Sequence, residues 1–161
     1  MADLASDRIS SSGTRAKFLI AALPVYLVEE PALDAYFDAV SSISSSGSQA
    51  RVLAAVLAHD PDRRTLVRVL GSVRSISSSG TKTRVLLAAA PHYKNGDDVG
   101  DTFFAAINSI SSSGDRARAL LALLDQELDR SATVSLLRSA SGIASSSSKT
   151  DRKSTRLNSS H

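Results

Sequence analysis

The feature that most constrains the fold is a five-residue string that returns at a nearly constant interval along the chain. Ile-Ser-Ser-Ser-Gly occupies residues 9–13, 43–47, 76–80 and 110–114, and a degraded copy begins at Ile143. Successive copies are 33 or 34 residues apart. Repetition at such a period is typical of arrays of stacked supersecondary units, in which each unit contacts only its neighbours. The chain is therefore best interpreted as a tandem repeat.

Each repeat contains two stretches with helical periodicity. Behind the first Ser-Ser-Ser-Gly string, apolar residues recur with offsets of 0, 1, 4 and 5 at Phe18, Leu19, Ala22 and Leu23, and these offsets return in the next three repeats. Such spacing places one apolar stripe on one face of a helix. A second stretch, with apolar steps of three and four residues, ends at each recurring isoleucine. We predict an all-α fold, an α-solenoid of stacked two-helix repeats with a period of 33–34 residues.

Helix boundaries follow from prolines and from the repeat itself. Proline is favoured at the first helical position, so Glu30-Pro31 and Asp60-Pro61 mark the starts of two second helices. The predicted divisions are a stub of a preceding repeat or an N-terminal arm at 1–8, repeats at 9–42, 43–75, 76–109 and 110–142, a truncated fifth repeat at 143–150, and a tail at 151–161. Because incomplete repeats stand at both ends, we expect the chain to be an excerpt of a longer array.

The tail, residues 151–161, does not continue the repeat. Residues 148–150 match residues 81–83 in register, after which a basic residue, an apolar residue and a leucine should follow. Residues 151–153, Asp-Arg-Lys, stand there instead, and the whole tail resembles a translated sequencing adapter. We expect it to be artefactual and disordered. The tail carries +2 of the formal net charge of +3, so the repeats themselves are nearly neutral.

The string Ile-Ser-Ser-Ser-Gly-Asp-Arg-Ala-Arg-Ala-Leu-Leu-Ala-Leu-Leu at residues 110–124 resembles repeats of bacterial HEAT-like regions. Some of these regions lie at the C-terminus of membrane metallopeptidases of the β-lactam-sensor type. The resemblance covers residues 9–150 and implies a stack of helix pairs. The His-Glu-x-x-His motif of those peptidases is absent from this chain, so the resemblance implies no peptidase activity.

The serine triplets are predicted to cap helices. A serine hydroxyl just before a helix accepts a hydrogen bond from one of the first N–H groups, which have no partner within the helix. We assign this role to the serine that precedes each recurring glycine. These serines are Ser12, Ser46, Ser79 and Ser113.

One basic residue recurs at the same helical position of every repeat, and these residues are called the basic ladder below. They are Lys17, Arg51, Arg84 and Arg118. In one interpretation the four cations line a surface that binds an acidic peptide or a phosphate backbone. In the other, each cation pairs with an acid or carbonyl group of the neighbouring repeat and holds the stack in register. The second interpretation is favoured, because a stacking contact must recur in every repeat.

The sequence indicates no catalytic, cofactor-binding or metal-binding residues, and we predict that the protein is not an enzyme. It has no cysteine, and no histidine or carboxylate has metal-ligand spacing. The longest apolar run, residues 18–28, is shorter than the roughly 20 residues of a membrane span, so no membrane insertion is expected. The leading hypothesis is a scaffold or regulatory array that binds a protein or peptide. The alternative, less favoured because the repeats are nearly neutral, is a nucleic-acid-binding array that uses the basic ladder.

Overall fold

The computed structural model describes residues 11–26 and 30–143, and every regular element in these ranges is a helix. No strand occurs among them, so the prediction of an all-α fold is confirmed. The predicted stub at 1–8, residues 144–150 of the truncated repeat and the tail at 151–161 lie outside the described residues. In chain order the helices are α2 (Ser12–Tyr26), α3 (Glu30–Ser41), α4 (Ser46–Ala58), α5 (Arg63–Val73), α6 (Ser79–Ala89), the short 3-10 helix η1 (Ala90–His92), α7 (Asp97–Asn108), α8 (Ser113–Leu124) and a final helix at residues 130–143.

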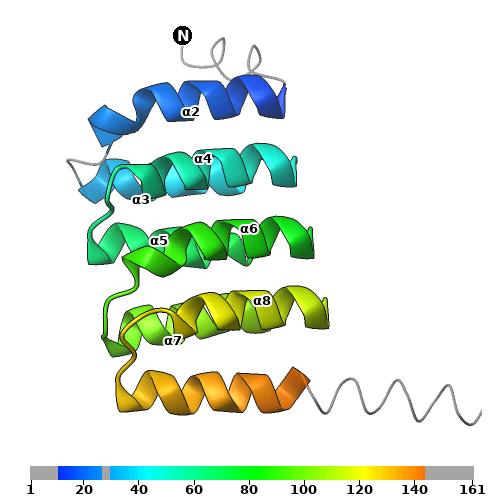
Figure 1. Ribbon diagram of the computed structural model, residues 1–161. Coiled ribbons are helices and arrows are strands. Elements are labelled where there is room, and N and C mark those ends of the chain that lie inside the picture. The colour runs from blue at the N-terminus through cyan, green and yellow to red at the C-terminus, as the bar shows by residue number, and fades with distance from the viewer. Residues whose placement is uncertain (1–10, 27–29, 144–161) are drawn as a thin grey trace, which may run out of the picture.

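The helices form two layers. α2, α4, α6 and α8 contact one another in that order, and α3, α5 and α7 do the same. α2, α4 and α6 also contact the helices that follow them in the chain, which are α3, α5 and α7. Figure 1 shows the resulting pairs one above another, with the final helix beside α8 at the end of the stack. We call the first set the A layer and the second set, including the final helix, the B layer.

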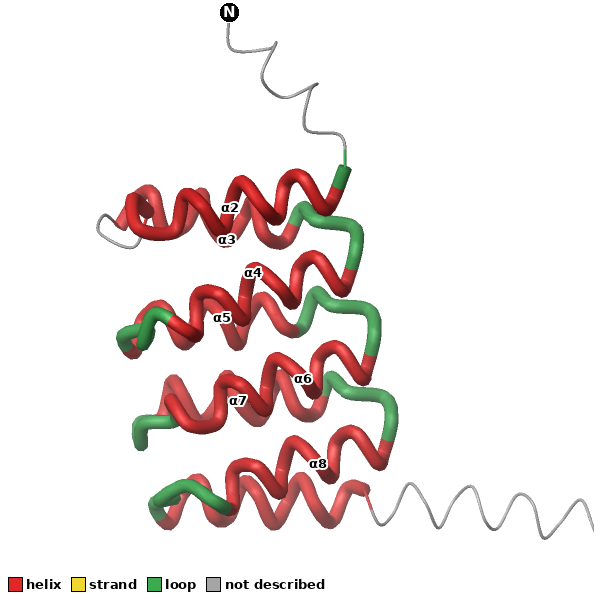
Figure 2. The backbone as a smooth tube through the Cα atoms, turned by 45° about the horizontal axis from the view of Figure 1, so that its top comes forward, coloured by secondary structure: helices red, strands yellow, loops and turns green. Residues whose placement is uncertain are grey.

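The connections of the stack lie along its two edges. The loops that lead from one helix pair to the next carry the Ile-Ser-Ser-Ser-Gly strings, and Figure 2 shows these loops in a line along one edge. The connections from α4 to α5, from α6 to α7 and from α8 to the final helix lie along the opposite edge. Any contact made by the recurring string is therefore repeated along one side of the molecule.

The core lies between the layers and between successive pairs. In α4 the predicted apolar stripe is buried, since Val52, Leu53, Val56 and Leu57 are at most 2% exposed. Two such faces meet at each junction because a single helix pair cannot cover its own apolar surface. Burying a side chain of this size favours folding by about 1.5–3 kcal/mol.

Tyr36 joins α3 to α2, and Tyr93, in the loop before α7, packs against that helix. The hydroxyl of Tyr36 in α3 donates a hydrogen bond to the carbonyl of Leu19 in α2, at 3.1 Å. Burial raises the pKa of Tyr36 well above its usual range, so its hydroxyl remains a neutral donor. Tyr93 packs edge-on against Phe103 of α7, with the ring centres 5.9 Å apart. Such edge-to-face contacts suit the charge distribution of aromatic rings.

Ile143 lies in the final helix, but Ile43, Ile76 and Ile110 do not end α3, α5 and α7 as predicted. Those helices stop two or three residues earlier, and the three isoleucines lie in the following loops. Their N–H groups bond to carbonyls three residues back, as Ile43 does to Val40 and Ile76 to Val73, both at 3.1 Å. Ile43, Ile76 and Ile110 are all buried. Each isoleucine therefore extends the buried apolar core into the loop that follows a helix pair.

Proline marks only one of the two predicted helix starts. α3 begins at Glu30, directly before its proline, as predicted, but α5 begins at Arg63, two residues beyond Pro61. The residue between them, Asp62, caps α5, and its Oδ1 accepts a hydrogen bond from the N–H of Thr65 at 2.8 Å. An aspartate is a strong N-cap, so the cap and not the proline defines this start.

Candidate functional site

The middle serine of each triplet caps the helix that follows. Ser45 has an extended backbone, and its Oγ accepts a hydrogen bond from the N–H three residues later, at 3.3 Å. Ser78 and Ser112 make the same bond at 3.3 Å, and Ser11 does so at 3.1 Å. The prediction that the third serine caps is wrong by one residue, because the third serine is already the first residue of the helix. Those third serines are Ser12, Ser46, Ser79 and Ser113.

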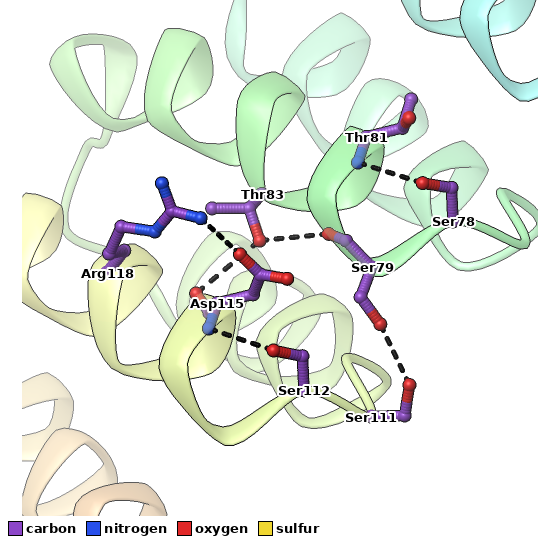
Figure 3. Close-up of polar contacts among 8 residues, drawn as sticks. All are labelled: Ser78, Ser79, Thr81, Thr83, Ser111, Ser112, Asp115 and Arg118. Carbon is purple, nitrogen blue, oxygen red and sulfur yellow. Dashed lines mark hydrogen bonds and ion pairs between the residues drawn. The ribbon is translucent and has the colours of Figure 1, made fainter.

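Three of the third serines join neighbouring repeats instead. The hydroxyl of Ser46 is hydrogen-bonded to that of Ser77 at 2.9 Å, and the hydroxyl of Ser79 to that of Ser111 at 2.8 Å (Figure 3). Ser12 makes the equivalent contact with the next repeat at 3.0 Å. In an internal string the first serine thus binds the previous repeat, the second caps its own helix and the third binds the next repeat. These structural contacts account for the serines without a catalytic role.

A second recurring contact closes the first three helix pairs, and sequence reasoning missed it. The Nζ of Lys82 donates to the carbonyl and the Oγ of Ser109, both at 3.0 Å. Arg15 makes the same two contacts with Ser42, at 3.2 and 3.1 Å. Gln49 donates to the equivalent serine hydroxyl of its own repeat at 2.6 Å. These donors lie in the first turn of an A-layer helix, and they reach the C-terminal end of a B-layer helix, where carbonyls lack partners.

These donors are called the clamp residues below. The sequence pattern did not reveal them, because the donor is an arginine in the first repeat, a glutamine in the second and a lysine in the third. The available signal was a long side chain with N–H donors two residues before every member of the basic ladder. In the fourth repeat this residue, Arg116, donates to the carbonyl of Ile110 at 2.6 Å. Burial lowers the pKa of Lys82, and the nearby charge of Arg74 lowers it further.

The basic ladder faces solvent, and the predicted pairing of its residues across repeats is wrong. All four side chains are exposed. Arg118 pairs with Asp115 of its own helix, not with the neighbouring repeat (Figure 3). Within the described part of the chain, Lys17, Arg51 and Arg84 make no side-chain hydrogen bond or ion pair. Contacts across and within repeats are made by the serines and the clamp residues, so the ladder has no such structural role.

Neighbouring ladder residues line shared grooves between A-layer helices. Arg51 and Arg84 line the groove between α4 and α6, together with Ala54. Arg84 and Arg118 line the next groove, between α6 and α8, together with Leu87, which is 41% exposed. No aromatic residue lines either groove. This surface, called the A face below, therefore presents cations beside small and aliphatic side chains.

The recurring glycine lies on the same surface. Gly47 and Gly80 each line one of the two grooves. A Cβ atom added to either residue would meet no neighbouring atom within 4 Å. Neither glycine has a positive φ angle. Packing and backbone strain thus do not require glycine here, and its effect is to keep the groove open above the first turn of the helix.

The B layer differs, because two of its arginines are paired across repeats. The Nε of Arg63 in α5 donates to Oδ1 of Asp98 in α7 at 2.9 Å. On the other side of α5, Arg68 pairs with Asp34 of α3. The hydrogen bond from Arg63 lowers the pKa of Asp98. The pairing expected of the basic ladder is therefore made by other residues on the other layer.

Other functional chemistry is sparse. The Nδ1 of His92 lies 3.4 Å from Oδ1 of Asp60. Among the described residues, no three histidine, cysteine, aspartate or glutamate side chains gather closely enough to hold a metal ion. None of the described helices combines the length and the apolar character needed to cross a bilayer. Comparisons with protein-family models, with curated proteins and with solved structures found no match to this chain.

Proposed function

We propose that this chain is a non-catalytic α-solenoid scaffold of HEAT-like helical repeats, and that its A face binds an acidic segment of a protein partner. The single observation that carries the proposal is the outward exposure of the whole basic ladder. Within the described residues, Lys17, Arg51 and Arg84 have no acid to neutralise them. Their charge is therefore available to a partner, and repeat arrays commonly bind partners along such extended surfaces.

The spacing of the ladder favours an extended acidic segment. Packed helices lie about 8–10 Å apart, so successive ladder cations are separated by roughly that distance. An extended peptide advances about 3.3 Å per residue. A carboxylate at every third residue of such a segment would therefore meet one cation per repeat. Cations placed in this way steer an acidic partner to the surface and set its register.

The aliphatic side chains beside the ladder favour a protein partner over a nucleic acid. Leu87 is partly exposed beside Arg84, and Leu121 is exposed one turn after Arg118. A peptide with aliphatic residues between its acids would bury these leucines. Single-stranded nucleic acids are usually bound by stacking on aromatic rings, and neither groove is lined by one.

The alternative, a nucleic-acid-binding array, rests on the same exposed ladder. Four cations on one surface would attract a phosphate backbone whatever its base sequence. This attraction falls steeply with salt, because binding releases the counterions of the nucleic acid. Salt dependence together with the choice of ligand therefore separates the two functions.

The test is a titration of the protein into a fluorescently labelled peptide that carries glutamate at every third position and leucine between. We expect the peptide to bind at low salt, as measured by fluorescence anisotropy. Arg84→Glu should weaken binding about tenfold, equivalent to about 1.4 kcal/mol. The matched control, Arg138→Glu, makes the same change of charge at an exposed position of the final helix. It should leave the affinity nearly unchanged.

Two outcomes would contradict the proposal. If Arg84→Glu and Arg138→Glu weaken binding equally, the peptide responds to overall charge and not to the A face. If the peptide does not bind while a labelled DNA or RNA duplex binds with a steep salt dependence, the nucleic-acid alternative is the better description.

A further inference from the structure

The four cations of the basic ladder do not share the same surroundings. Arg118 of α8 forms an ion pair with Asp115 of the same helix. Lys17, Arg51 and Arg84 form no ion pair with any described residue. The groove between α4 and α6 is thus lined by two cations without a described acid beside them, and the groove between α6 and α8 by only one. The positive charge of the ladder is therefore weakest at the fourth repeat.

The difference arises at one position of the repeat, three residues before the ladder cation. Asp115 holds this position in the fourth repeat, and side chains three residues apart on a helix are neighbours. The first three repeats hold an uncharged residue with a hydroxyl group there, and these residues are Thr14, Ser48 and Thr81. A hydroxyl group cannot neutralise a cation. The change from a hydroxyl residue to an aspartate therefore distinguishes the fourth repeat from the first three.

The side chain of Asp115 is held beside the groove between α6 and α8. It is only 15% exposed, whereas the side chain of Arg118 is 66% exposed. The N–H of Asp115 donates to the Oγ of Ser112 at 3.3 Å, and its carbonyl accepts a hydrogen bond from the Oγ1 of Thr83 at 3.4 Å. Figure 3 shows the carboxylate turned toward Arg118. Because Thr83 and Arg118 both line the groove, the negative charge lies at its edge.

We propose that Asp115 is a specificity-determining residue of the A face, which restricts the acidic positions of a bound segment to the first three repeats. This inference rests on the function proposed above. A ligand carboxylate opposite Arg118 would meet a cation that is already paired and would be repelled by Asp115. No described acid competes for the other ladder cations. The preferred ligand is therefore an extended acidic segment with an uncharged residue opposite Arg118.

Asp115 also has an effect that involves no ligand. It lies in the first turn of α8, where a negative charge interacts favourably with the helix dipole. This interaction stabilises the helix whatever is bound to the A face. It cannot make the affinity for a peptide depend on the charge of one peptide residue. Peptides that differ at a single position therefore separate the structural effect of Asp115 from its effect on specificity.

The experiment compares labelled peptides of equal length by fluorescence anisotropy at low salt. One peptide has glutamate at four positions, each three residues after the last, and two others have glutamine at the first or the last of these. The wild type should bind all three peptides with similar affinity. Asp115→Ser should bind the four-glutamate peptide about threefold more tightly than the other two, which is the size of one exposed ion pair. Asp125→Ser is the matched control, because it removes the same charge at the exposed C-cap of the same helix. It should keep the wild-type preference.

The converse variant, Thr81→Asp, places an acid three residues before Arg84. It should weaken binding of the four-glutamate peptide about threefold more than Thr81→Asn does. Circular dichroism verifies that each variant keeps its helices. If the wild type and Asp115→Ser prefer the four-glutamate peptide equally, the role of Asp115 is overturned and the proposed function stands. If none of the peptides binds to the wild type, the proposed function fails and this inference fails with it.

Discussion

Arg63 and Arg68 of the B layer and Arg51 and Arg84 of the A layer have opposite surroundings. In the B layer, Arg63 and Arg68 of α5 each bind an aspartate of a neighbouring repeat. In the A layer, Arg51 and Arg84 recur in register but extend into solvent, without a partner among the described residues. The difference lies in the partners within reach, since α3 and α7 each place an aspartate against an arginine of α5, whereas Arg51 and Arg84 meet no acid of a neighbouring helix among the described residues. Recurrence of a cation therefore does not by itself show that the cation holds repeats together.

This contrast separates stability from binding. Half-exposed ion pairs such as those of the B layer each contribute only about 0–1 kcal/mol, because water screens them and ordering the side chains costs entropy. They set the register of the helices more than they stabilise the fold. Arg51 and Arg84 contribute neither to the register of the helices nor to the stability of the fold. Changing them should therefore alter binding and leave folding intact. The following expectations test that separation, from the largest effect to the smallest.

Two adjacent leucines of α6 should respond very differently to truncation. Leu86 is buried in the core, whereas Leu87 lines a groove of the A face. Leu86→Ala should lower the free energy of unfolding by about 2–5 kcal/mol, because it leaves a cavity. Leu87→Ala should change it by less than about 0.5 kcal/mol, yet weaken binding of the acidic peptide. Urea unfolding followed by circular dichroism measures the first quantity. Similar losses of stability in both variants would show that the two sides of α6 are not distinct.

The lysine clamp should contribute an intermediate amount. Lys82→Ala removes the hydrogen bonds to Ser109 and should cost about 1–2 kcal/mol. Lys82→Gln should cost less, because Gln49 fills the same position in the preceding repeat with a neutral donor. The same urea titrations test both values. Equal losses in the two variants would mean that the ammonium charge, and not its hydrogen bonds, is what matters.

The clamp also predicts a dependence on pH. Burial lowers the pKa of Lys82 in the folded state, so the unfolded chain binds more protons between this lowered pKa and the ordinary lysine pKa. Stability attributable to Lys82 should therefore rise as the pH increases through that window. Comparing the wild type with Lys82→Gln from neutral to alkaline pH isolates this effect. A difference between them that stays constant with pH would contradict it.

Removing the aspartate cap of α5 should have a smaller effect. Asp62→Ala leaves the N–H of Thr65 without its acceptor and should cost about 1 kcal/mol at neutral pH. Hydrogen bonds from Thr65 lower the pKa of Asp62, the backbone bond being the larger cause. The stabilisation is therefore present above the ordinary carboxyl pKa and is lost as the pH falls through the lowered value. Unfolding of both proteins at neutral and acidic pH should show the gap closing.

The smallest effect concerns the charges themselves. A double-mutant cycle with Asp34→Ala and Arg68→Ala should give a coupling energy of about 0.2–1 kcal/mol. Arg84→Ala should not change the unfolding free energy measurably, because the side chain is exposed and pairs with nothing among the described residues. A clear loss of stability in Arg84→Ala would remove the distinction between the two layers.

Much of the fold was predictable from the repeat and from apolar periodicity. The stripe that includes Val52 and Leu53 is buried as its spacing predicts. The local assignments were less accurate. Three identical serines cannot reveal which one caps, so the assignment to Ser46 fell one residue beyond the true cap, Ser45. The apolar pattern also continued through Ile43, although the helix ends before it, because a buried loop residue and a buried helical residue look alike in a sequence.

The sequence by itself determined the period of the array, its helical character and the buried stripe of the central repeats. These follow from the geometry of one helix, with 3.6 residues per turn, acting on a pattern that returns at regular intervals. Only the tertiary structure decided the role of each cation. Lys82 meets a serine 27 residues away and Arg68 an aspartate 34 residues away, while Arg84 meets neither. Such partners come from neighbouring helices, whose separation and rotation are set by the packing of whole faces and not by any local pattern.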